Sequence, residues 1–205
     1  MNVFVLGTGR CGSVTFSKAC QHITNYTSGH ETRWGHKGAS RLTFRDKHIE
    51  VDNRLSWHLG ELGAMYPDAF FVHLVRDREA TAKSFATRWR IDPPYRYRSA
   101  PRGFRRLIRR FESSGSRPGI IEAYAYSVLG RNRPWEHRER LDVCRAYVDT
   151  VNSNIQEFLK DRDSLEVRLE QAAEAFDTFW ERLGAEGDAT AAIAELQRPY
   201  NASAS

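Results

Sequence analysis

The chain has little cysteine and little lysine, and each shortage narrows the possible functions. Its 205 residues include 3 cysteines, an odd number at scattered positions without the close spacing of metal ligands. We therefore expect a reduced, cytoplasmic protein without a metal site.

The basic residues are almost all arginine, 26 against 5 lysines. Guanidinium is the better bidentate partner of phosphate and sulfate, so this bias is compatible with an anionic ligand as well as with plain genomic composition.

Long hydrophobic runs are also missing. No run is long enough to span a bilayer, and Met1-Asn2 leads directly into the first apolar stretch, without the basic and apolar regions of a signal peptide. These features predict no membrane span and no targeting segment. The length suits a single α/β domain over residues 1–205, and the formal net charge is +5.

The N-terminal segment has the pattern of a phosphate-binding turn. Residues 3–6 are apolar and predict a strand, and three glycines follow within six residues, Gly7, Gly9 and Gly12. Such glycines let backbone amides converge on an anion, and a following helix adds the partial positive charge of its N-terminus. The glycine spacing is close to the P-loop pattern, but Ser13 stands where a nucleoside triphosphatase has lysine. The alternative is a tight strand-to-helix connection without a ligand.

A second polar segment follows another apolar run, over residues 70–75, which predicts a buried strand. Arg76 comes directly after this run, and Ser84 follows eight residues later. Asp77 is a good N-cap, so a helix is expected to begin beside it. Arg76 and Ser84 are therefore candidates for a shared anion, and the alternative is that both are ordinary surface residues.

Together these segments resemble the sulfotransferases that use 3′-phosphoadenosine 5′-phosphosulfate (PAPS). The shared features are an N-terminal strand, a basic-x-Gly-(Ser/Thr) loop, a helix, and an Arg-x₇-Ser pair after a core strand. The resemblance implies an α/β, P-loop-like three-layer fold with a central parallel sheet of four or five strands flanked by helices. It implies PAPS as co-substrate and no metal.

The resemblance also assigns residues. It places Arg10, Gly12 and Ser13 at the 5′-phosphosulfate, and Arg76 with Ser84 at the 3′-phosphate. Val14 stands where many members have a second hydroxyl, and Thr15 follows one place later. The full cofactor-binding set is Gly7, Gly9, Arg10, Cys11, Gly12, Ser13, Val14, Thr15, Arg76 and Ser84.

Sulfuryl transfer requires positive charge on the bridging oxygens and a base for the acceptor proton. Arg10 supplies the charge. Two carboxylates compete as the base: Glu31, in a Gly-x-Glu context similar to the glutamate bases of carbohydrate-type sulfotransferases, and Asp52. The alternative is that each carboxylate only pairs with an arginine.

The rest of the chain predicts further βαβ elements. Residues 42–51 fit either two short strands around a turn at 46–47 or a simple loop. We expect further strands at about 25–28 and 165–170, and helices at 13–23, 55–65, 120–129, 141–158 and 172–183.

Residues 88–119 form an Arg/Pro-rich excursion that interrupts this order. Ten arginines fall between Arg88 and Arg117. This segment is either a lid or acceptor platform or a solvated basic face or oligomer contact. Binding of nucleic acid is the less favoured interpretation.

We therefore expect a sulfotransferase that acts on a hydroxyl or amine of a small-molecule or glycan acceptor, polar or anionic in character. The oligomeric state stays open. A P-loop small-molecule kinase is one alternative, although it would need lysine in place of Ser13. A non-catalytic nucleotide- or anion-binding module is the other, and it predicts that Glu31 and Asp52 point away from the glycine-rich turn.

Overall fold

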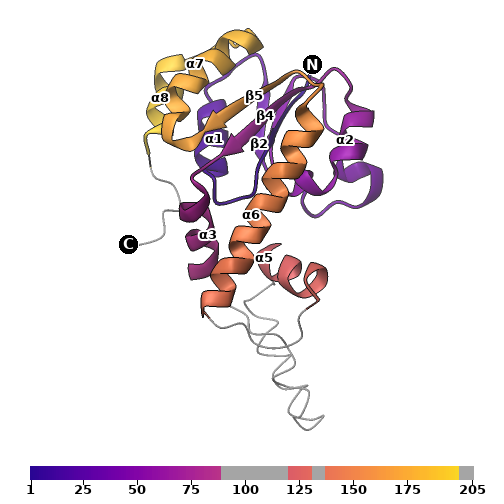
Figure 1. Cartoon of the computed structure of the whole chain (residues 1–205). Coiled ribbons are helices and arrows are strands. Elements are labelled where there is room, and N and C mark those ends of the chain that lie inside the picture. The colour runs from indigo at the N-terminus through magenta and orange to yellow at the C-terminus, as the bar shows by residue number, and fades with distance from the viewer. Residues whose placement is uncertain (89–119, 131–136, 199–205) are drawn as a thin grey trace, which may run out of the picture. The chain divides into compact units, whose positions relative to one another are not determined.

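The computed structural model describes residues 1–88, 120–130 and 137–198 (Figure 1). The chain divides into two compact units. The first contains Met1–Asp77 and Asp149–Ser205, and the second contains Arg78–Val148. Most of the Arg/Pro-rich excursion, residues 89–119, lies outside the described residues.

The first unit is built on a five-stranded sheet in which every pairing is parallel. The order across the sheet is β2-β3-β1-β4-β5. This architecture confirms the predicted α/β fold class with a central parallel sheet flanked by helices. The strands are β1 (Val3–Leu6), β2 (Thr27–His30), β3 (His48–Val51), β4 (Phe70–Val75) and β5 (Ser164–Arg168).

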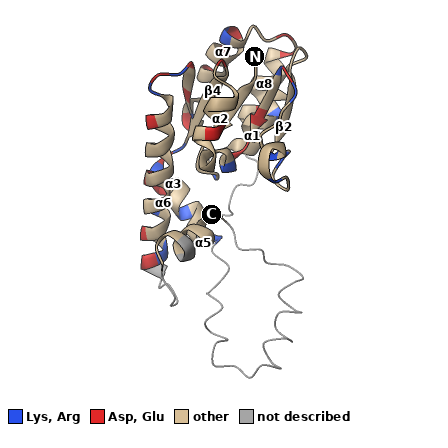
Figure 2. Cartoon of the chain, turned by 90° about the vertical axis from the view of Figure 1, so that its right-hand side faces the viewer, with Lys and Arg blue, Asp and Glu red and all other residues tan. Residues whose placement is uncertain are grey.

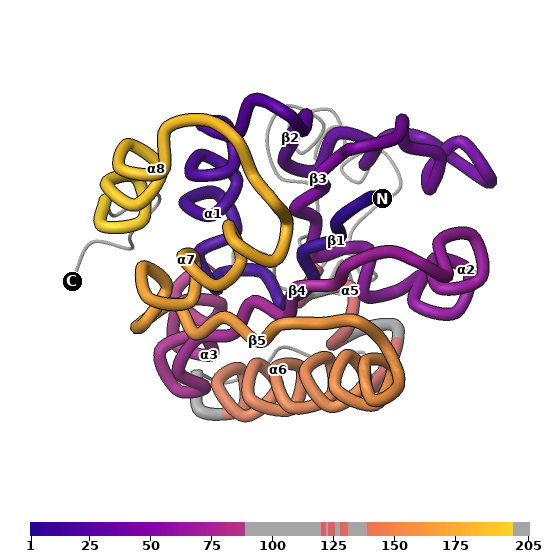
Figure 3. The backbone as a smooth tube through the Cα atoms, turned by 90° about the horizontal axis from the view of Figure 1, so that it is seen from above, coloured from indigo at the N-terminus to yellow at the C-terminus, as the bar shows by residue number. Residues whose placement is uncertain are grey.

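Helices cover both faces of this sheet (Figure 3), which explains why β1 is apolar throughout and β4 is apolar except at His73, instead of alternating between apolar and polar residues. All residues of β1, β3 and β4 are buried. The helices of the first unit are α1 (Ser13–Cys20), α2 (Leu59–Met65), α7 (Ala172–Leu183), α8 (Ala189–Leu196) and the C-terminal part of α6 (His137–Leu159). Short 3₁₀ turns lie at Gly38–Arg41 (η1), Asn53–Trp57 (η2) and Leu169–Gln171 (η5).

One face of the sheet packs against α1, α7 and α8. Phe179 of α7 lies at the centre of an aromatic cluster, with its ring centroid 5.4 Å from that of Phe16 and 6.0 Å from that of Phe70. Phe176 adds a further contact at 5.3 Å. Burial of these rings supplies much of the apolar area that holds the helices to the sheet.

The other face packs against α2 and the end of α6. Because side chains alternate along a strand, Phe71 points away from Phe70 and contacts Phe158 of α6, with ring centroids 5.2 Å apart. His73 lies on the same face and shares a hydrogen bond of 3.1 Å with Asn152. Burial lowers the pKa of His73, since it disfavours the charged imidazolium.

The second unit contains α3 (Arg78–Thr87), α5 (Ile120–Ala123), a π-helical turn at Tyr124–Val128, and the N-terminal part of α6. Tyr147 of α6 is fully buried and contacts Phe85 and Tyr124 edge to face. Arg145 donates to both carboxylate oxygens of Glu79, through Nε to Oε1 at 2.9 Å and through Nη2 to Oε2 at 2.7 Å. Both acidic and basic residues occur along the described part of α6 (Figure 2).

Several predicted boundaries are wrong. The helix expected at 13–23 ends at Cys20, and the strand expected at 25–28 occupies Thr27–His30. The 42–51 segment forms one strand instead of two, because residues 42–46 pack as a loop in which Phe44 N–H donates to the Tyr66 hydroxyl.

The elements later in the chain differ less from their predicted boundaries. The helix expected at 55–65 is divided into η2 and α2, and the last strand ends at Arg168 before η5. Helix α7 matches the predicted 172–183, and Gly184 follows it in the left-handed conformation.

The neighbouring strands β1 and β3 are followed by helices on opposite faces of the sheet. Strand β1 leads into α1 on the face of Phe16, whereas β3 leads through η2 to α2, where Tyr66 contacts Phe4 on the other face. The carboxyl ends of β1 and β3 therefore define a topological switch point. Open parallel sheets bind ligands at this position.

No helix in the described part of the chain is both long and apolar enough to cross a bilayer.

We expect Phe179→Ala to lower the free energy of unfolding by about 3–5 kcal/mol, because it leaves a cavity among three aromatic rings. Urea unfolding followed by circular dichroism measures this change. The matched control is Thr178→Ala, an exposed neighbour on α7, which should change stability by no more than about 0.5 kcal/mol. Equal effects of the two substitutions would contradict the placement of Phe179.

Candidate functional site

The loop between β1 and α1 has an unusual backbone. Gly9, Arg10 and Gly12 all have positive φ, at 79°, 59° and 89°. Glycine adopts this conformation without strain, whereas Arg10 does so at a cost. At Gly12 the backbone conformation favours glycine, and a Cβ atom would lie 2.4 Å from a methyl carbon of Leu169, whose side chain would have to move. The loop is thereby held in a tight turn ahead of α1.

Helix α1 begins directly after this turn. Gly12 is the N-cap and supplies no side-chain hydrogen bond to the first turn. The first-turn amides of a helix have no acceptor within the helix, so those of Ser13, Val14 and Thr15 are positioned to bind an anion. Ser13 and Val14 are partly exposed, whereas Thr15 is buried. Ser13 is therefore the accessible hydroxyl of the loop.

Cys11 anchors the loop to the core instead of facing solvent. Its side chain is buried within the α1 face of the sheet. Burial raises the pKa of the thiol, and hydrogen bonds from the loop backbone act in the opposite direction. Only the backbone of Cys11 is therefore available to a ligand.

Arg76 lies at the carboxyl end of β4, beside the loop. Its Nη1 donates a hydrogen bond of 3.2 Å to the carbonyl oxygen of Arg10. The structure thus brings together two predicted site residues that are 66 positions apart in sequence. The following residue, Asp77, donates its N–H to the carboxylate of Glu170, which lies in η5, two residues after the end of β5.

Ser84 lies on α3, within the second unit, and is buried. Helix α3 begins at Arg78, directly after Asp77, as the N-cap pattern predicts. The shared contact of Ser84 and Arg76 with a 3′-phosphate stays a prediction from the resemblance.

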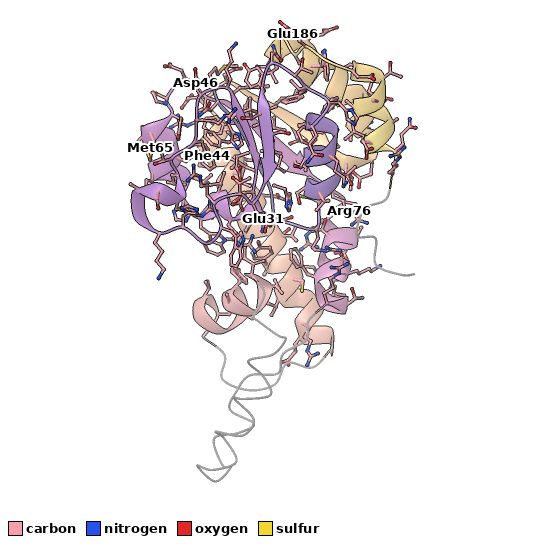
Figure 4. The ribbon with its side chains drawn as sticks, turned by 180° about the vertical axis from the view of Figure 1, so that it is seen from behind. Glu31, Phe44, Asp46, Met65, Arg76 and Glu186 are labelled. Carbon is pink, nitrogen blue, oxygen red and sulfur yellow. The ribbon has the colours of Figure 1, made fainter. Side chains whose placement is uncertain are left out.

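Glu31 comes directly after β2 and has a φ of 52°. Its N–H donates to Val51 O at 3.1 Å, and its carboxylate pairs with Arg54, which follows β3. The Glu31 side chain is 25% exposed. In Figure 4 Glu31 and Arg76 lie at one end of the sheet, while Asp46 and Glu186 lie at the opposite end.

A buried network supports the turn after Glu31. The carboxylate of Glu50 accepts hydrogen bonds from Thr32 N at 2.7 Å and from Thr32 Oγ1 at 2.6 Å. His48 contacts the same carboxylate through Nε2 at 2.9 Å. Since Glu50 is fully buried, its carboxylate requires these hydrogen-bond partners. The hydrogen bonds from Thr32 also hold the turn that follows Glu31.

Asp52 is fully buried and already has two partners. Arg41 Nη2 lies 2.5 Å from its Oδ2, and Arg54 N–H donates to its Oδ1 at 2.8 Å. Burial raises the pKa of Asp52, while the hydrogen bond from Arg54 and the charge of Arg41 act in the opposite direction. The carboxylate is closed to solvent, unlike that of Glu31.

Sequence reasoning missed four residues of this edge: His30, Arg41, Arg54 and Ser56. His30 contacts Ser13, and Ser56 donates to Gly7 O at 3.2 Å. Both arginines pair with the predicted carboxylates. Arg54 follows the end of β3 by three residues, whereas Arg76 follows β4 directly. An arginine soon after a core strand was the signal that the sequence offered for Arg54.

Among the described residues, no group of three or more His, Cys, Asp or Glu side chains has the arrangement of a metal site.

Comparisons with known proteins are sparse. No protein-family model matches the chain. A search of curated proteins also finds no match. Among solved structures, the fold is similar to mouse sulfotransferase SULT7A1 complexed with PAP, with a TM-score of 0.51 and 13% sequence identity. The similarity covers 95% of this chain and 62% of that chain, so this chain spans less than two thirds of the mouse protein. At this identity the likeness shows the fold alone: a sulfotransferase-like α/β fold.

We expect Arg41→Met to lower the free energy of unfolding by about 3–5 kcal/mol at neutral pH, because it leaves the buried Asp52 carboxylate without its charged partner. This loss of unfolding free energy should become smaller at acidic pH. Without Arg41, the folded pKa of Asp52 rises further above its unfolded value of about 3.9, so stability is retained below that value and falls as the pH rises through the folded pKa.

Urea unfolding at several pH values measures this dependence. Arg45→Met, at an exposed arginine in the loop before β3, is the matched control. It should leave the free energy of unfolding nearly unchanged at every pH. A loss for Arg41→Met that stays constant with pH would contradict the assignment to Asp52.

Proposed function

We propose that the protein transfers a sulfuryl group from PAPS to a hydroxyl or amine of a polar acceptor. The observation that carries this proposal is the meeting of the β1–α1 loop and Arg76 at the carboxyl edge of a sulfotransferase-like sheet. The resemblance assigned the first to the 5′-phosphosulfate and the second to the 3′-phosphate. The solved structure with a similar fold is complexed with PAP.

The 5′ group is assigned to the backbone amides from Gly7 to Thr15, the Ser13 hydroxyl and the Arg10 guanidinium. The amides and the α1 N-terminus favour negative charge. Arg76 is assigned to the 3′-phosphate as a charged donor, and the assignment of Ser84 is carried over from the resemblance.

The reaction is an in-line displacement at sulfur. The acceptor oxygen or nitrogen forms a bond to sulfur while the bond from sulfur to the bridging phosphate oxygen breaks, and its electron pair leaves with the nucleotide phosphate. Arg10 stabilises the charge that develops on the bridging oxygen. The acceptor proton passes to a base.

We assign the base to Glu31 in preference to Asp52. Glu31 keeps a partly exposed carboxylate at the carboxyl edge of the sheet, whereas Asp52 is fully buried and engaged by Arg41 and Arg54. The pairing of Glu31 with Arg54 orients the carboxylate. Asp52 serves instead as a structural anchor for η2.

Binding of 3′-phosphoadenosine 5′-phosphate (PAP) tests the nucleotide assignment. We expect calorimetry to give a micromolar affinity, which Arg76→Ala weakens by about 10- to 100-fold through the loss of a charged hydrogen bond. Arg45→Ala removes the same charge from a loop that precedes β3 and should leave the affinity within about twofold.

Two outcomes would overturn the proposal. Tighter binding of ATP with Mg²⁺ than of PAP would favour a small-molecule kinase. Absence of binding to either nucleotide would favour a turn that serves only the fold.

Turnover of PAPS tests the base. In the presence of a panel of sugars, phenols and amines, we expect Glu31→Gln to slow PAP release by about 10²–10⁴-fold, since an amide cannot accept the proton. Its affinity for PAP should be unchanged. Glu61→Gln, at an exposed carboxylate on α2, is the control. Equal rates for Glu31→Gln and the unmodified protein would exclude Glu31 as the base.

A further inference from the structure

His30 is the last residue of β2, and its imidazole reaches the β1–α1 loop. The Nε2 atom lies 3.1 Å from Ser13 Oγ, within hydrogen-bond distance. Both side chains are partly exposed.

The alternation of side chains along β2 explains why the His30 side chain points toward this loop. Thr27 and Gly29 face the buried pair of His48 and Glu50, with Thr27 Oγ1 2.9 Å from His48 Nδ1. His30, one residue after Gly29, therefore points to the opposite face of the sheet, where α1 packs.

We propose that His30 is a positioning residue for the Ser13 hydroxyl, donating to Ser13 Oγ through Nε2–H. This inference rests on the proposed function, which assigns Ser13 to the 5′-phosphosulfate. A serine hydroxyl has one proton, and a phosphosulfate oxygen only accepts. Ser13 can therefore donate to the nucleotide only if it accepts from His30.

The other tautomer has the opposite effect. If Nδ1 carried the proton, Nε2 would accept the hydroxyl proton of Ser13, and the oxygen lone pairs would face the anion. The contact would then weaken binding instead of strengthening it. The proposed role of Ser13 therefore requires the tautomer of His30 that carries its proton on Nε2, and this tautomer can be measured.

Nitrogen-15 NMR of the imidazole determines the tautomer directly, in the protein without nucleotide and with PAP. We expect a proton on Nε2 of His30 in both. A neutral ring with its proton on Nδ1 would overturn the proposal. This measurement does not depend on PAP binding, so absence of PAP binding would overturn the proposed function while the tautomer still decides the direction of the His30–Ser13 hydrogen bond.

Substitutions test the same contact through affinity. We expect His30→Phe and Ser13→Ala each to weaken PAP binding by about tenfold, the usual size of one hydrogen bond to a charged partner. In His30→Gln the side-chain amide nitrogen occupies nearly the position of Nε2, so we expect affinity within about threefold of the unmodified protein. His30→Asn places its amide nearer the position of Nδ1 and should not restore binding.

A double variant separates positioning from a structural effect. In the Ser13→Ala background, His30→Phe should weaken PAP binding by less than about twofold, because it acts through the missing hydroxyl. His36→Phe, at an exposed histidine in the loop after β2, controls for the introduced ring. Additive losses, or a loss that follows the melting temperature and is not restored by His30→Gln, would overturn the positioning role.

Discussion

The parallel pairing of β1 on both sides is the constraint on which the candidate site depends. Val3 pairs with Ile49 of β3 and with Phe70 of β4, so three strands from distant parts of the sequence end at one edge. Their backbone hydrogen bonds and the burial of both sheet faces hold this arrangement. The glycine-rich loop after β1 therefore lies between the segments that follow β3 and β4.

Charge at this edge is balanced locally. Glu31 pairs with Arg54, and the buried Asp52 pairs with Arg41, so part of the arginine excess orients carboxylates instead of facing a ligand. The amides at the start of α1 provide positive potential without a mobile side chain. Under the proposed function, these preorganised dipoles would stabilise the negative charge that develops on the leaving phosphate oxygen.

The sequence predicted the elements that carry a strong local signal. The apolar runs at 3–6 and 70–75 form strands, and the glycine turn and the N-cap at Asp77 precede helices as expected. The 42–51 segment was harder because its alternation resembles a hairpin, while packing of Phe44 against Tyr66 decides that only His48–Val51 joins the sheet. Boundaries failed where a tertiary contact overrides local propensity.

By itself, the sequence determined the glycine turn and the polar residues that follow each core strand, because backbone freedom, side-chain periodicity and capping act over a few residues. Only the tertiary structure decided that β1 lies between β3 and β4, that Arg76 reaches Arg10, and that His30 contacts Ser13. It also distinguished the partly exposed Glu31 from the buried Asp52. The reason is physical: strand order and burial arise from contacts between residues far apart in the chain, and no local pattern encodes them.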